Sequence, residues 1–449
     1  MGLLTFRGGI RLPAQKDISK DKPIRTLLPN GEFVYPLLQH KGAPAKPIVE
    51  PGEYVRKGQL IADAGEYVSV PVHASVSGTV KAIEPRCTAT GSQIDSIILE
   101  SDGLFQEVAY HVTDDIHKLY NEEILERIRE AGVAGMSGAG MPTHVKLFPK
   151  NPEKIDYIIA NGVECEPYLT ADYREMLENP EKMIEGMRIL LKLFDHAKGV
   201  FGIADDKPAC IEKLMELTIE EPRMEVVRLR TKYPQGAERQ LIYAITGRAI
   251  PYTTLPSDEG YIVDNVATLG AVYDAVKLGR PVTTRVVTVS GDAVKEPCNF
   301  RCPIGTSFRS LLDAAGGWKV QPEKVVAGGP MMGAAIASLD VPVTKITTGL
   351  VGMKKDGVPA ERDATACINC GRCIRVCPVR IVPSRLSALS RRGDRKNFEK
   401  TNGMECMECG SCDFICPAKI RLVQDIRGMK VQILTERSLN RRSERGGVL

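Results

Sequence analysis

The chain has 449 residues, too many for one hydrophobic core, and this length predicts about three domains. Hydrophobic residues make up 43% and charged residues 26% of the sequence, and the net charge is +4, as in soluble globular proteins. No stretch approaches the roughly 18 apolar residues of a membrane span, and the N-terminus has no signal-peptide core. We therefore expect any membrane association to depend on partner proteins or on the surface.

The first part of the chain, residues 1–110, predicts short strands separated by turns. Residues 51–61 and residues 70–80 each alternate around a turn, a pattern that resembles the barrel-sandwich fold of biotinyl and lipoyl carriers. A carrier would have its modified lysine in the hairpin between these runs, but that hairpin contains no lysine. We therefore predict a structural or partner-binding module. His73 and Cys87 stand alone, and packing roles are favoured over ligand roles for both.

The next part, residues 111–282, predicts a Rossmann-like α/β domain. Strand and helix patterns alternate along it, with strands at 157–160, 199–203 and 224–229 and helices at 121–130, 179–194, 207–217, 235–245 and 265–278. Such alternation indicates a largely parallel sheet, in which ligands bind at the carboxyl ends of the strands. Polar segments stand at two of these ends, at 161–167 and at 232–238.

A glycine-rich loop, residues 135–143, follows the first predicted helix of this domain. Its glycines, Gly135, Gly138 and Gly140, would let the backbone approach a phosphate closely and offer N–H groups to it. Loops of this composition also occur as plain turns, so the loop by itself is a weak indication of a binding site.

Residues 283–352 predict a small α+β module of the β-grasp type. Its predicted elements are a strand at 285–291, a helix at 306–315 and a strand at 325–327. Cys298 and Cys302 have the spacing of a ligand pair, but no other Cys or His stands near them in the sequence. Packing roles are therefore favoured for both.

Two cysteine runs near the C-terminus repeat one pattern of spacing. The first is Cys367-x2-Cys370-x2-Cys373-x3-Cys377-Pro378, and the second is Cys406-x2-Cys409-x2-Cys412-x3-Cys416-Pro417. This is the spacing of bacterial two-cluster ferredoxins, in which three thiolates of a run bind one cluster and the fourth binds the other. We predict one [4Fe–4S] cluster on Cys367, Cys370, Cys373 and Cys416, and a second on Cys406, Cys409, Cys412 and Cys377.

Other uses of these cysteines are less favoured. Zinc knuckles also contain Cys-x2-Cys pairs, but four ligands per zinc leave the third cysteine and the Cys-Pro ending unexplained. A disulfide framework does not fit so tight and regular a spacing. A thiolate-rich, oxygen-labile protein belongs in a reducing compartment, so we expect it in the cytoplasm.

The cysteine runs define a two-cluster ferredoxin-like helical domain at 353–437. Its predicted parts are a polar linker at 353–363 and helices at 383–391 and 422–434, with a frayed tail at 438–449. Residues 361–449 hold 18 Lys and Arg against 10 Asp and Glu. This excess either offsets the anionic clusters or forms a docking face for an acidic electron-transfer partner. Aromatic residues are sparse there, which disfavours a nucleic-acid site.

Four segments, in order, resemble the flavin domain of the NADH-oxidising subunit of respiratory complex I. They are the loop at 135–146, the segment at 161–167, the turn at 236–238 and the segment at 265–269. The chain departs from that family in having Val163 for an acid, Ala237 for a glutamate and Met141 for an aromatic residue. The complex I subunit also lacks the N-terminal module and has a single cluster of different spacing.

The whole arrangement resembles the C subunit of the Rnf electron-transport complex. Segments at 5–10, 39–44, 73–78 and 328–333, together with the paired cysteine runs, extend this likeness over nearly the full length. The flavin/iron–sulfur cobalamin reductases share the flavin loop and the cysteine runs, but they are not expected to open with this N-terminal segment. A soluble reductase of that kind is the alternative.

The resemblance implies a set of FMN contacts. They are Gly135, Gly138, Gly140, Lys146, Asn161, Glu164, Gly236, Glu238, Asn265 and Thr268. Lys146 would offset the flavin phosphate or the developing flavin anion, and Glu166 would lie near NAD(H). Hydride transfer needs no acid–base side chain, so we predict no catalytic residue.

The two kinds of cofactor would act one after the other in electron transfer. NADH delivers two electrons as hydride, whereas a [4Fe–4S] cluster carries one at a time, so a flavin between them is required. The resemblance therefore implies a peripheral NADH-oxidising subunit on the cytoplasmic side of the cell membrane. Its partners would be other subunits of a ferredoxin:NAD oxidoreductase, including an iron–sulfur subunit, in a complex that moves Na+ or H+. No nucleic-acid partner is expected.

Overall fold

The computed structural model describes residues 3–354 and 363–446, so most of the predicted linker lies outside the described residues. The chain divides into two compact units. The first comprises Met1–Leu4, Pro13–Arg230 and Leu255–Lys355, and the second comprises Thr5–Leu12, Thr231–Thr254 and Asp356–Leu449. Two segments that the sequence assigns to the N-terminal and flavin domains thus belong to the unit that contains both cysteine runs.

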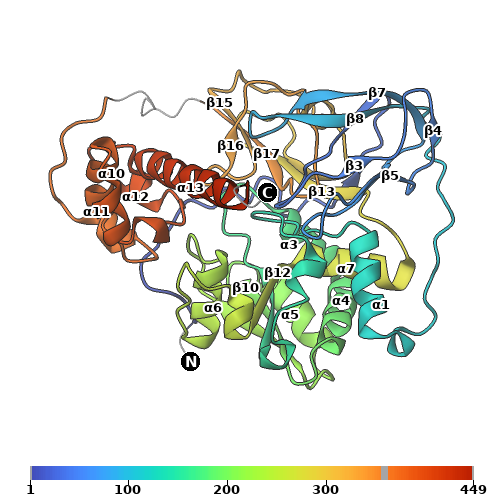
Figure 1. Ribbon diagram of the computed structural model, residues 1–449, viewed down its shortest axis with the longest axis horizontal. Coiled ribbons are helices and arrows are strands. Elements are labelled where there is room, and N and C mark those ends of the chain that lie inside the picture. The colour runs from blue at the N-terminus through green and yellow to red at the C-terminus, as the bar shows by residue number, and fades with distance from the viewer. Residues whose placement is uncertain (1–2, 355–362, 447–449) are drawn as a thin grey trace. The chain divides into compact units, whose positions relative to one another are not determined.

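The N-terminal module of the first unit consists of two small antiparallel sheets (Figure 1). One sheet has the order β2 (Glu32–Pro36), β8 (Gln93–Ser101), β7 (Gly78–Cys87) and β4 (Tyr54–Val55), and the other β3 (Lys46–Pro47), β5 (Leu60–Asp63) and β6 (Val72–His73). Tyr35, Ile61 and Ile97 are fully buried in the core of this module. His73 is buried with them, while Cys87 is exposed at the end of its strand.

The flavin domain of the first unit is built on a four-stranded parallel sheet, as the alternation of elements predicts. Its order is β11 (Met224–Leu229), β10 (Lys198–Ala204), β9 (Tyr157–Gly162) and β12 (Tyr261–Asn265). Asn161 and Asn265 are paired in register where β9 and β12 end, so both stand at the carboxyl edge of the sheet. This is the edge at which ligands bind in such sheets.

The helices of this domain are α1 (Asn121–Glu130), α2 (Thr143–Lys146), α3 (Ala171–Glu178), α4 (Pro180–Lys192), α5 (Pro208–Leu217) and α7 (Val266–Leu278). α1, α4, α5 and α7 lie where the sequence predicts helices, whereas α2 and α3 were not predicted. α4 and α7 pack on each other and on β9 (Figure 1). Asn265 caps α7 by accepting a hydrogen bond from the Ala267 N–H at 2.9 Å, and Gly279 ends that helix with φ of +64°.

The β-grasp module contributes a six-stranded mixed sheet and the helix α8 (Phe308–Ala314). The strand order is β1 (Arg25–Thr26), β14 (Cys298–Pro303), β13 (Thr284–Ser290), β17 (Gly349–Met353), β15 (Lys324–Ala327) and β16 (Ala334–Ala335). β1 joins this sheet from the N-terminal segment by pairing in parallel with β14. Cys298 and Cys302 lie in the apolar core beneath the sheet, which supports their packing roles.

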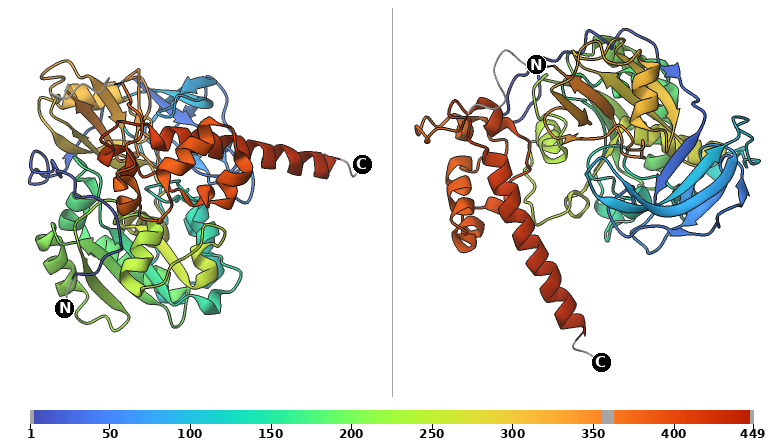
Figure 2. Two further views of the ribbon diagram at one scale, coloured as in Figure 1. Left: turned by 90° about the vertical axis from the view of Figure 1, so that its left-hand side faces the viewer. Right: turned by 90° about the horizontal axis from the view of Figure 1, so that it is seen from above.

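The second unit is helical. Its helices are α6 (Glu238–Thr246), α9 (Arg372–Val376), α10 (Pro383–Arg391), α11 (Arg395–Lys400), α12 (Ser411–Ile415) and α13 (Leu422–Gly446). Figure 2 shows α13 as one long continuous helix, and α10 packs along it. The described chain has no helix of the length and apolar character that spanning a membrane demands.

Two predictions about this unit are wrong in detail. The predicted helix at 235–245 begins only at Glu238, because Ala237 has extended backbone and is the cap of α6. The tail beyond residue 437, predicted to be frayed, continues α13 as far as Gly446. Ile426, Met429 and Ile433 anchor the start of α13 in the core, and each residue added to an established helix gains a hydrogen bond at small entropic cost.

Candidate functional site

The glycine-rich loop lies at the start of the flavin domain. Gly138 and Gly140 have φ of +64° and +63°, which a residue with a Cβ rarely adopts. A Cβ at Gly140 would meet Ile346 at 2.5 Å, whereas a Cβ at Gly138 would meet nothing within 4 Å. The base of the loop is therefore packed and its tip is open, which is the shape that a backbone needs to receive a phosphate.

Two buried side chains hold the base of this loop. The Met136 N–H donates to Thr268 Oγ1 at 3.0 Å, so Thr268 from α7 fixes the loop instead of pointing away from it. The Arg285 guanidinium donates to the Met136 carbonyl, and its Nε donates to the Thr347 carbonyl at 2.9 Å. Burial lowers the pKa of Arg285. Sequence reasoning missed Arg285, since nothing distinguishes it from other strand residues of β13.

Lys146, at the end of α2, already has partners on the carboxyl edge of the sheet. Its Nζ donates to the Val263 carbonyl at 2.6 Å and to Asp264 Oδ1 at 2.9 Å. The Asp264 side chain is completely buried, and its other oxygen, Oδ2, has no hydrogen-bond donor among the described residues. Asp264 was not predicted as a site residue, although it stands directly before Asn265 in the sequence.

Four polar side chains meet where β9 and β12 end. Asn161 Oδ1 accepts from the Val163 N–H, and Glu164 Oε1 accepts from the Asp172 N–H at 2.8 Å. Asn265 donates its side-chain amide to Asp172 Oδ2 at 2.7 Å. Burial, and then the Glu164 carboxylate, raise the pKa of Asp172. The structure thus joins Glu164 and Asn265 through Asp172, an acid that the sequence did not single out, and strand register places Asn161 beside Asn265.

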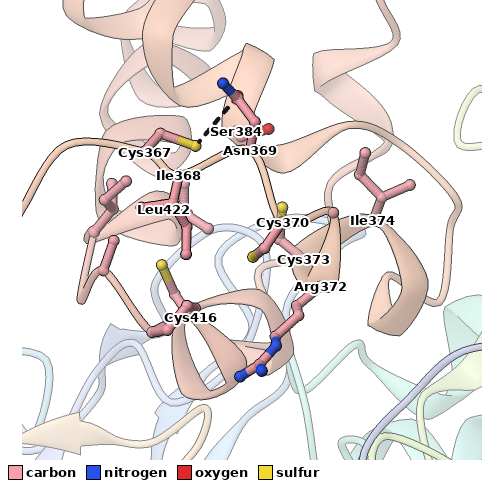
Figure 3. Close-up of a pocket in the computed structure, with 14 residues that line it drawn as sticks. Cys367, Ile368, Asn369, Cys370, Arg372, Cys373, Ile374, Ser384, Cys416 and Leu422 are labelled. Atoms are coloured by element: carbon pink, nitrogen blue, oxygen red, sulfur yellow. Dashed lines mark hydrogen bonds between the residues drawn. The ribbon is translucent and has the colours of Figure 1, made fainter.

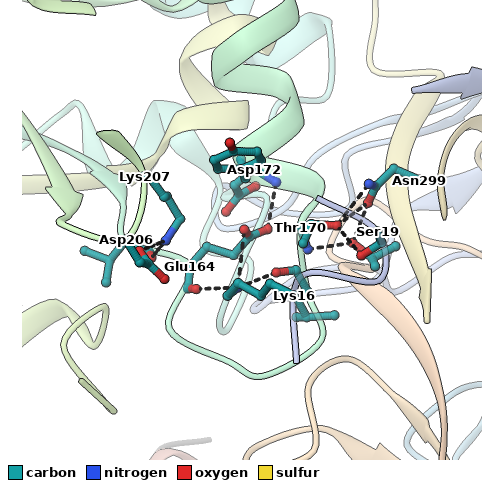
Figure 4. Close-up of polar contacts among 12 residues, drawn as sticks. Lys16, Ser19, Glu164, Thr170, Asp172, Asp206, Lys207 and Asn299 are labelled. Atoms are coloured by element: carbon teal, nitrogen blue, oxygen red, sulfur yellow. Dashed lines mark hydrogen bonds and ion pairs between the residues drawn. The ribbon is translucent and has the colours of Figure 1, made fainter. Parts of the chain in front are cut away.

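Glu164 is bound by a lysine from the N-terminal segment (Figure 4). Lys16 Nζ donates to the Glu164 carbonyl at 2.9 Å and to the Leu169 carbonyl, and lies 3.5 Å from Glu164 Oε2. Lys207 on the other side donates to the Val163 carbonyl and to Asp206, each at 2.8 Å. No motif near Lys16 could have predicted this role, because about 150 residues separate it from its partner.

Glu166 contacts the β-grasp module. Its carboxylate accepts the N–H groups of Met331 and Met332, at 3.0 and 2.9 Å, from the loop at 328–333. A Cβ at Gly329 would lie 2.4 Å from Glu166 Oε2, so only glycine allows this approach. Burial raises the pKa of Glu166. The predicted nucleotide-side residue is therefore held by a loop that the sequence assigns to another domain.

Gly236 and Glu238, the remaining predicted flavin contacts, belong to the second unit, where Glu238 is the first residue of α6. Their flavin role remains a prediction from the motif.

In the second unit, Cys367, Cys370, Cys373 and Cys416 line one cavity of about 100 Å³. Figure 3 shows their sulfur atoms around a common space, with Cys416 coming from the other run. Cys367 and Cys370 are exposed, and Ile368 and Leu422 complete part of the wall.

Cys377, Cys406, Cys409 and Cys412 are all buried. Burial raises the pKa of each of these thiols, to about 11 for Cys406, and the Cys409 thiol also raises the pKa of Cys377, Cys406 and Cys412. Lys430 donates to the Cys406 carbonyl at 2.5 Å. As in the first set, one cysteine of this set, Cys377, comes from the other run.

These surroundings fit the cofactors that the sequence implies. Each cysteine set is an all-sulfur ligand set of four, as [4Fe–4S] clusters require. Among the described residues, no three His, Cys, Asp or Glu side chains close on a single metal-ion position. The carboxylate oxygens Asp264 Oδ2 and Glu164 Oε2 are buried without hydrogen-bond donors, and the hydroxyl and N–H groups of a flavin are donors for such oxygens.

Four protein families together match most of the chain. Residues 128–274 match the Nuo51 FMN-binding domain, and residues 4–104 match the RnfC barrel sandwich hybrid domain. Residues 286–335 match the SLBB domain, and residues 360–418 match a 4Fe-4S dicluster domain.

Known relatives match over nearly the whole length. The chain is 45% identical to the C subunit of the proton-translocating ferredoxin:NAD(+) oxidoreductase complex of Clostridium ljungdahlii, over 95% of this chain and 94% of that protein. It is 41% identical to the C subunit of the Na(+)-translocating complex of Acetobacterium woodii, over 96% of this chain and 98% of that protein. The chain belongs to the family of C subunits of the Rnf ferredoxin:NAD(+) oxidoreductase complexes.

As a family member, the chain has the FMN-binding and [4Fe–4S] domains of an electron-transfer subunit, and the predicted barrel-sandwich and dicluster modules are confirmed. Among solved structures, an NAD+-reducing [NiFe]-hydrogenase in the H2-reduced state covers 68% of this chain and 60% of its own. Its TM-score is 0.47 and its sequence identity to this chain is 19%.

Proposed function

We propose that the chain exchanges hydride between NADH and FMN and passes single electrons through two [4Fe–4S] clusters. The observation that carries this proposal is the presence of an FMN-binding domain at 128–274 and a dicluster domain at 360–418 in one chain. FMN bound there would supply the conversion between two-electron and one-electron chemistry. Relatives at 41% to 45% identity favour this function over that of a soluble cobalamin reductase.

The described residues support particular roles in binding. The open tip of the loop at Gly138 receives the phosphate, and Lys146, paired with Asp264, supplies positive charge at the carboxyl edge of the sheet. Glu164 and Asn265 accept or donate hydrogen bonds on the flavin side, and Lys16 holds the Glu164 carboxylate in place. Glu166, with the loop at 328–333, forms the NAD(H) side.

The relatives also suggest the setting in which this chemistry occurs. Both are named as subunits of a ferredoxin:NAD(+) oxidoreductase complex, one translocating protons and the other Na+. We infer from these relatives that the chain is a subunit of a membrane complex coupled to Na+ or H+ movement, and we propose that it is peripheral, lies on the cytoplasmic side and contacts an iron–sulfur subunit.

The test is to measure FMN content and NADH-driven bleaching of flavin absorbance in the reconstituted chain. We expect bound FMN in the wild type, and about a hundredfold weaker FMN binding in Lys146→Ala, because its removal leaves the buried Asp264 charge unpaired. Lys150→Ala removes an exposed lysine nearby and serves as the matched control. Wild type that takes up clusters but no FMN would contradict the proposal, as would Lys146→Ala that binds FMN as tightly as the control.

A further inference from the structure

The N-terminal module is fixed to the β-grasp module by buried polar contacts. The Ser75 hydroxyl donates to the Ile304 carbonyl oxygen at 2.5 Å and lies 2.7 Å from the Tyr35 hydroxyl. Tyr35 and Ser75 are both completely buried, and the Val34 N–H donates to the Gly305 carbonyl oxygen at 3.2 Å. Buried hydrogen bonds are costly to break, so this module is held in place, unlike the swinging domain of a carrier. Its carrier-like fold therefore serves another purpose.

One turn of this module packs against the glycine-rich loop. The Lys41 N–H donates to the Gly140 carbonyl oxygen at 3.1 Å. A Cβ at Gly140 would lie 3.3 Å from His40 Cα and 2.5 Å from the Ile346 side chain, so the turn and the β-grasp module enclose this end of the loop. His40 Nε2 accepts the Val70 N–H at 3.2 Å, which holds the turn in place. Two modules outside the flavin domain therefore contact the loop.

Lys345 of the β-grasp module joins all three modules at the start of this loop. Its Nζ donates to the Gly132 carbonyl oxygen at 2.6 Å and to the Pro71 carbonyl oxygen at 2.7 Å, and its N–H donates to Gln39 Oε1 at 3.1 Å. Gly132 directly precedes the loop segment of the flavin domain, whereas Pro71 and Gln39 belong to the N-terminal module. A Cβ at Gly132 would lie 2.4 Å from Lys345 Nζ, so only glycine allows this approach.

The Lys345 side chain is buried without an acidic partner. It is 1% exposed, and it makes no ion pair with any of the described residues. Burial lowers its pKa to about 7. Burying an ammonium group costs free energy unless its N–H groups are hydrogen-bonded, and the Gly132 and Pro71 carbonyl oxygens supply those bonds. The residue before the loop and the N-terminal module are thus tied to one charged group.

A further contact reaches the helix that follows the loop. His144 Nε2 in α2 lies 3.1 Å from the Tyr67 carbonyl oxygen, and the two rings meet edge to face with their centroids 5.8 Å apart. The same helix ends in Lys146, a predicted flavin contact. The N-terminal module therefore contacts the loop and the helix after it, and it is joined through Lys345 to the residue before it.

We propose that the N-terminal module is part of the FMN site: it positions the glycine-rich loop to receive the FMN phosphate, and Lys345 is the positioning residue. This inference rests on the proposed function. Thr268 and Arg285 hold the base of the loop through Met136, and the N-terminal module holds its two ends. Glycines give a free loop many conformations, and ordering them on binding lowers affinity. A loop that is already held in place therefore binds phosphate more tightly.

The test compares FMN with riboflavin, which lacks the phosphate, in fluorescence titrations of the full-length chain. In Lys345→Met we expect FMN to bind about tenfold more weakly, the factor for one hydrogen bond from a charged donor, and riboflavin to bind within about twofold of wild type. In the flavin-free protein, amide hydrogen exchange of residues 133–143 should be about tenfold faster, while β9 keeps its protection. A purely structural role would instead weaken the binding of both flavins and speed exchange in β9.

Gln39→Leu tests the same junction without removing a charge. Gln39 is buried, and its Nε2 has no hydrogen-bond acceptor among the described residues, so leucine removes an unpaired donor together with the acceptor of the Lys345 N–H. We expect a nearly unchanged unfolding temperature, about threefold weaker FMN binding and unchanged riboflavin binding. Gln59→Leu is the matched control, because Gln59 accepts the Arg56 N–H at 3.0 Å within the N-terminal module. If Lys345→Met does not fold, Gln39→Leu decides.

The outcomes separate this inference from the proposed function. If the wild type takes up clusters but no FMN, the proposed function fails, and hydrogen exchange in the flavin-free variants still decides whether Lys345 positions the loop. If the wild type binds FMN and both variants bind it equally tightly, the N-terminal module is not part of the site. Equal weakening of FMN and riboflavin binding in the variants, or a wild type that binds the two flavins equally, would also overturn the inference.

Discussion

The two cysteine runs have the same spacing and nearly opposite surroundings. Within the first run stand Arg372 and Arg375, both exposed, and two of its first three cysteines are exposed. Within the second run stand Glu408 and Asp413, and its first three cysteines are buried.

This contrast shows what a ligand motif leaves undecided. Spacing fixes which thiolates can reach a cluster, whereas charge and solvent exposure around the cluster set its reduction potential and its access to partners. Reduction adds negative charge, so exposure and neighbouring arginines favour it at the first run. Burial opposes it at the second, where Arg427 and Lys430 are paired with Glu408. Three changes to the chain test this contrast.

The largest effect is expected from the fourth cysteine of each run, which is predicted to bind the cluster of the other run. Because Cys377 belongs to the buried set and Cys416 to the exposed set, each serine variant should lose the cluster of the opposite run. The EPR spectrum of Cys377→Ser should match that of Cys406→Ser, and that of Cys416→Ser should match that of Cys367→Ser. A Cys377→Ser spectrum that matches Cys367→Ser would show that each run binds its own cluster.

A smaller effect is expected from a methyl group at Gly8. Its φ of +86° costs any other residue about 1 kcal/mol, and the added Cβ would also overlap the Cys377 carbonyl oxygen, so we expect Gly8→Ala to lower the free energy of unfolding by about 2–3 kcal/mol. Gly371→Ala, with φ of +68° and nothing within 4 Å, isolates the backbone cost. Chemical denaturation of the full-length protein, followed at the second unit, measures the free energy of unfolding of both variants. If Gly8→Ala and Gly371→Ala lower the free energy of unfolding equally, the contact with the Cys377 carbonyl oxygen causes no strain.

The smallest effect is expected from the charges at the exposed run. Arg372→Glu combined with Arg375→Glu should slow electron transfer to an acidic iron–sulfur partner by about tenfold at low salt, and less at high salt. Stopped-flow transfer rates at two ionic strengths measure this. The matched control is Lys396→Glu with Lys400→Glu, two exposed lysines on α11. NADH-driven flavin bleaching should not change in either variant, and an equal slowing in the control would mean that net charge alone is responsible.

Local sequence patterns are enough to predict the secondary-structure elements and the classes of cofactor. The alternation of strands and helices predicted the parallel sheet, since apolar runs of strand length must be buried on both faces. The boundaries of α1, β11 and α10 agree with the predicted ones, because strong periodicity and turn residues mark their ends. The cysteine spacing predicted two ligand sets, each with one cysteine from the other run, because spacing is a local property of the chain.

The residues that complete the sites come together through long-range contacts of the folded chain. Lys16, Arg285 and Asp264 act through partners that are far away in sequence or on another strand, and no periodic pattern records such contacts. In the same way, the cysteine motif gives no indication of Tyr233 or Gly8, although the contacts of these two residues distinguish one cysteine set from the other. Local patterns determine the secondary structure and the ligand types, whereas burial and long-range hydrogen bonds determine which of two equal motifs is buried and which is exposed to solvent.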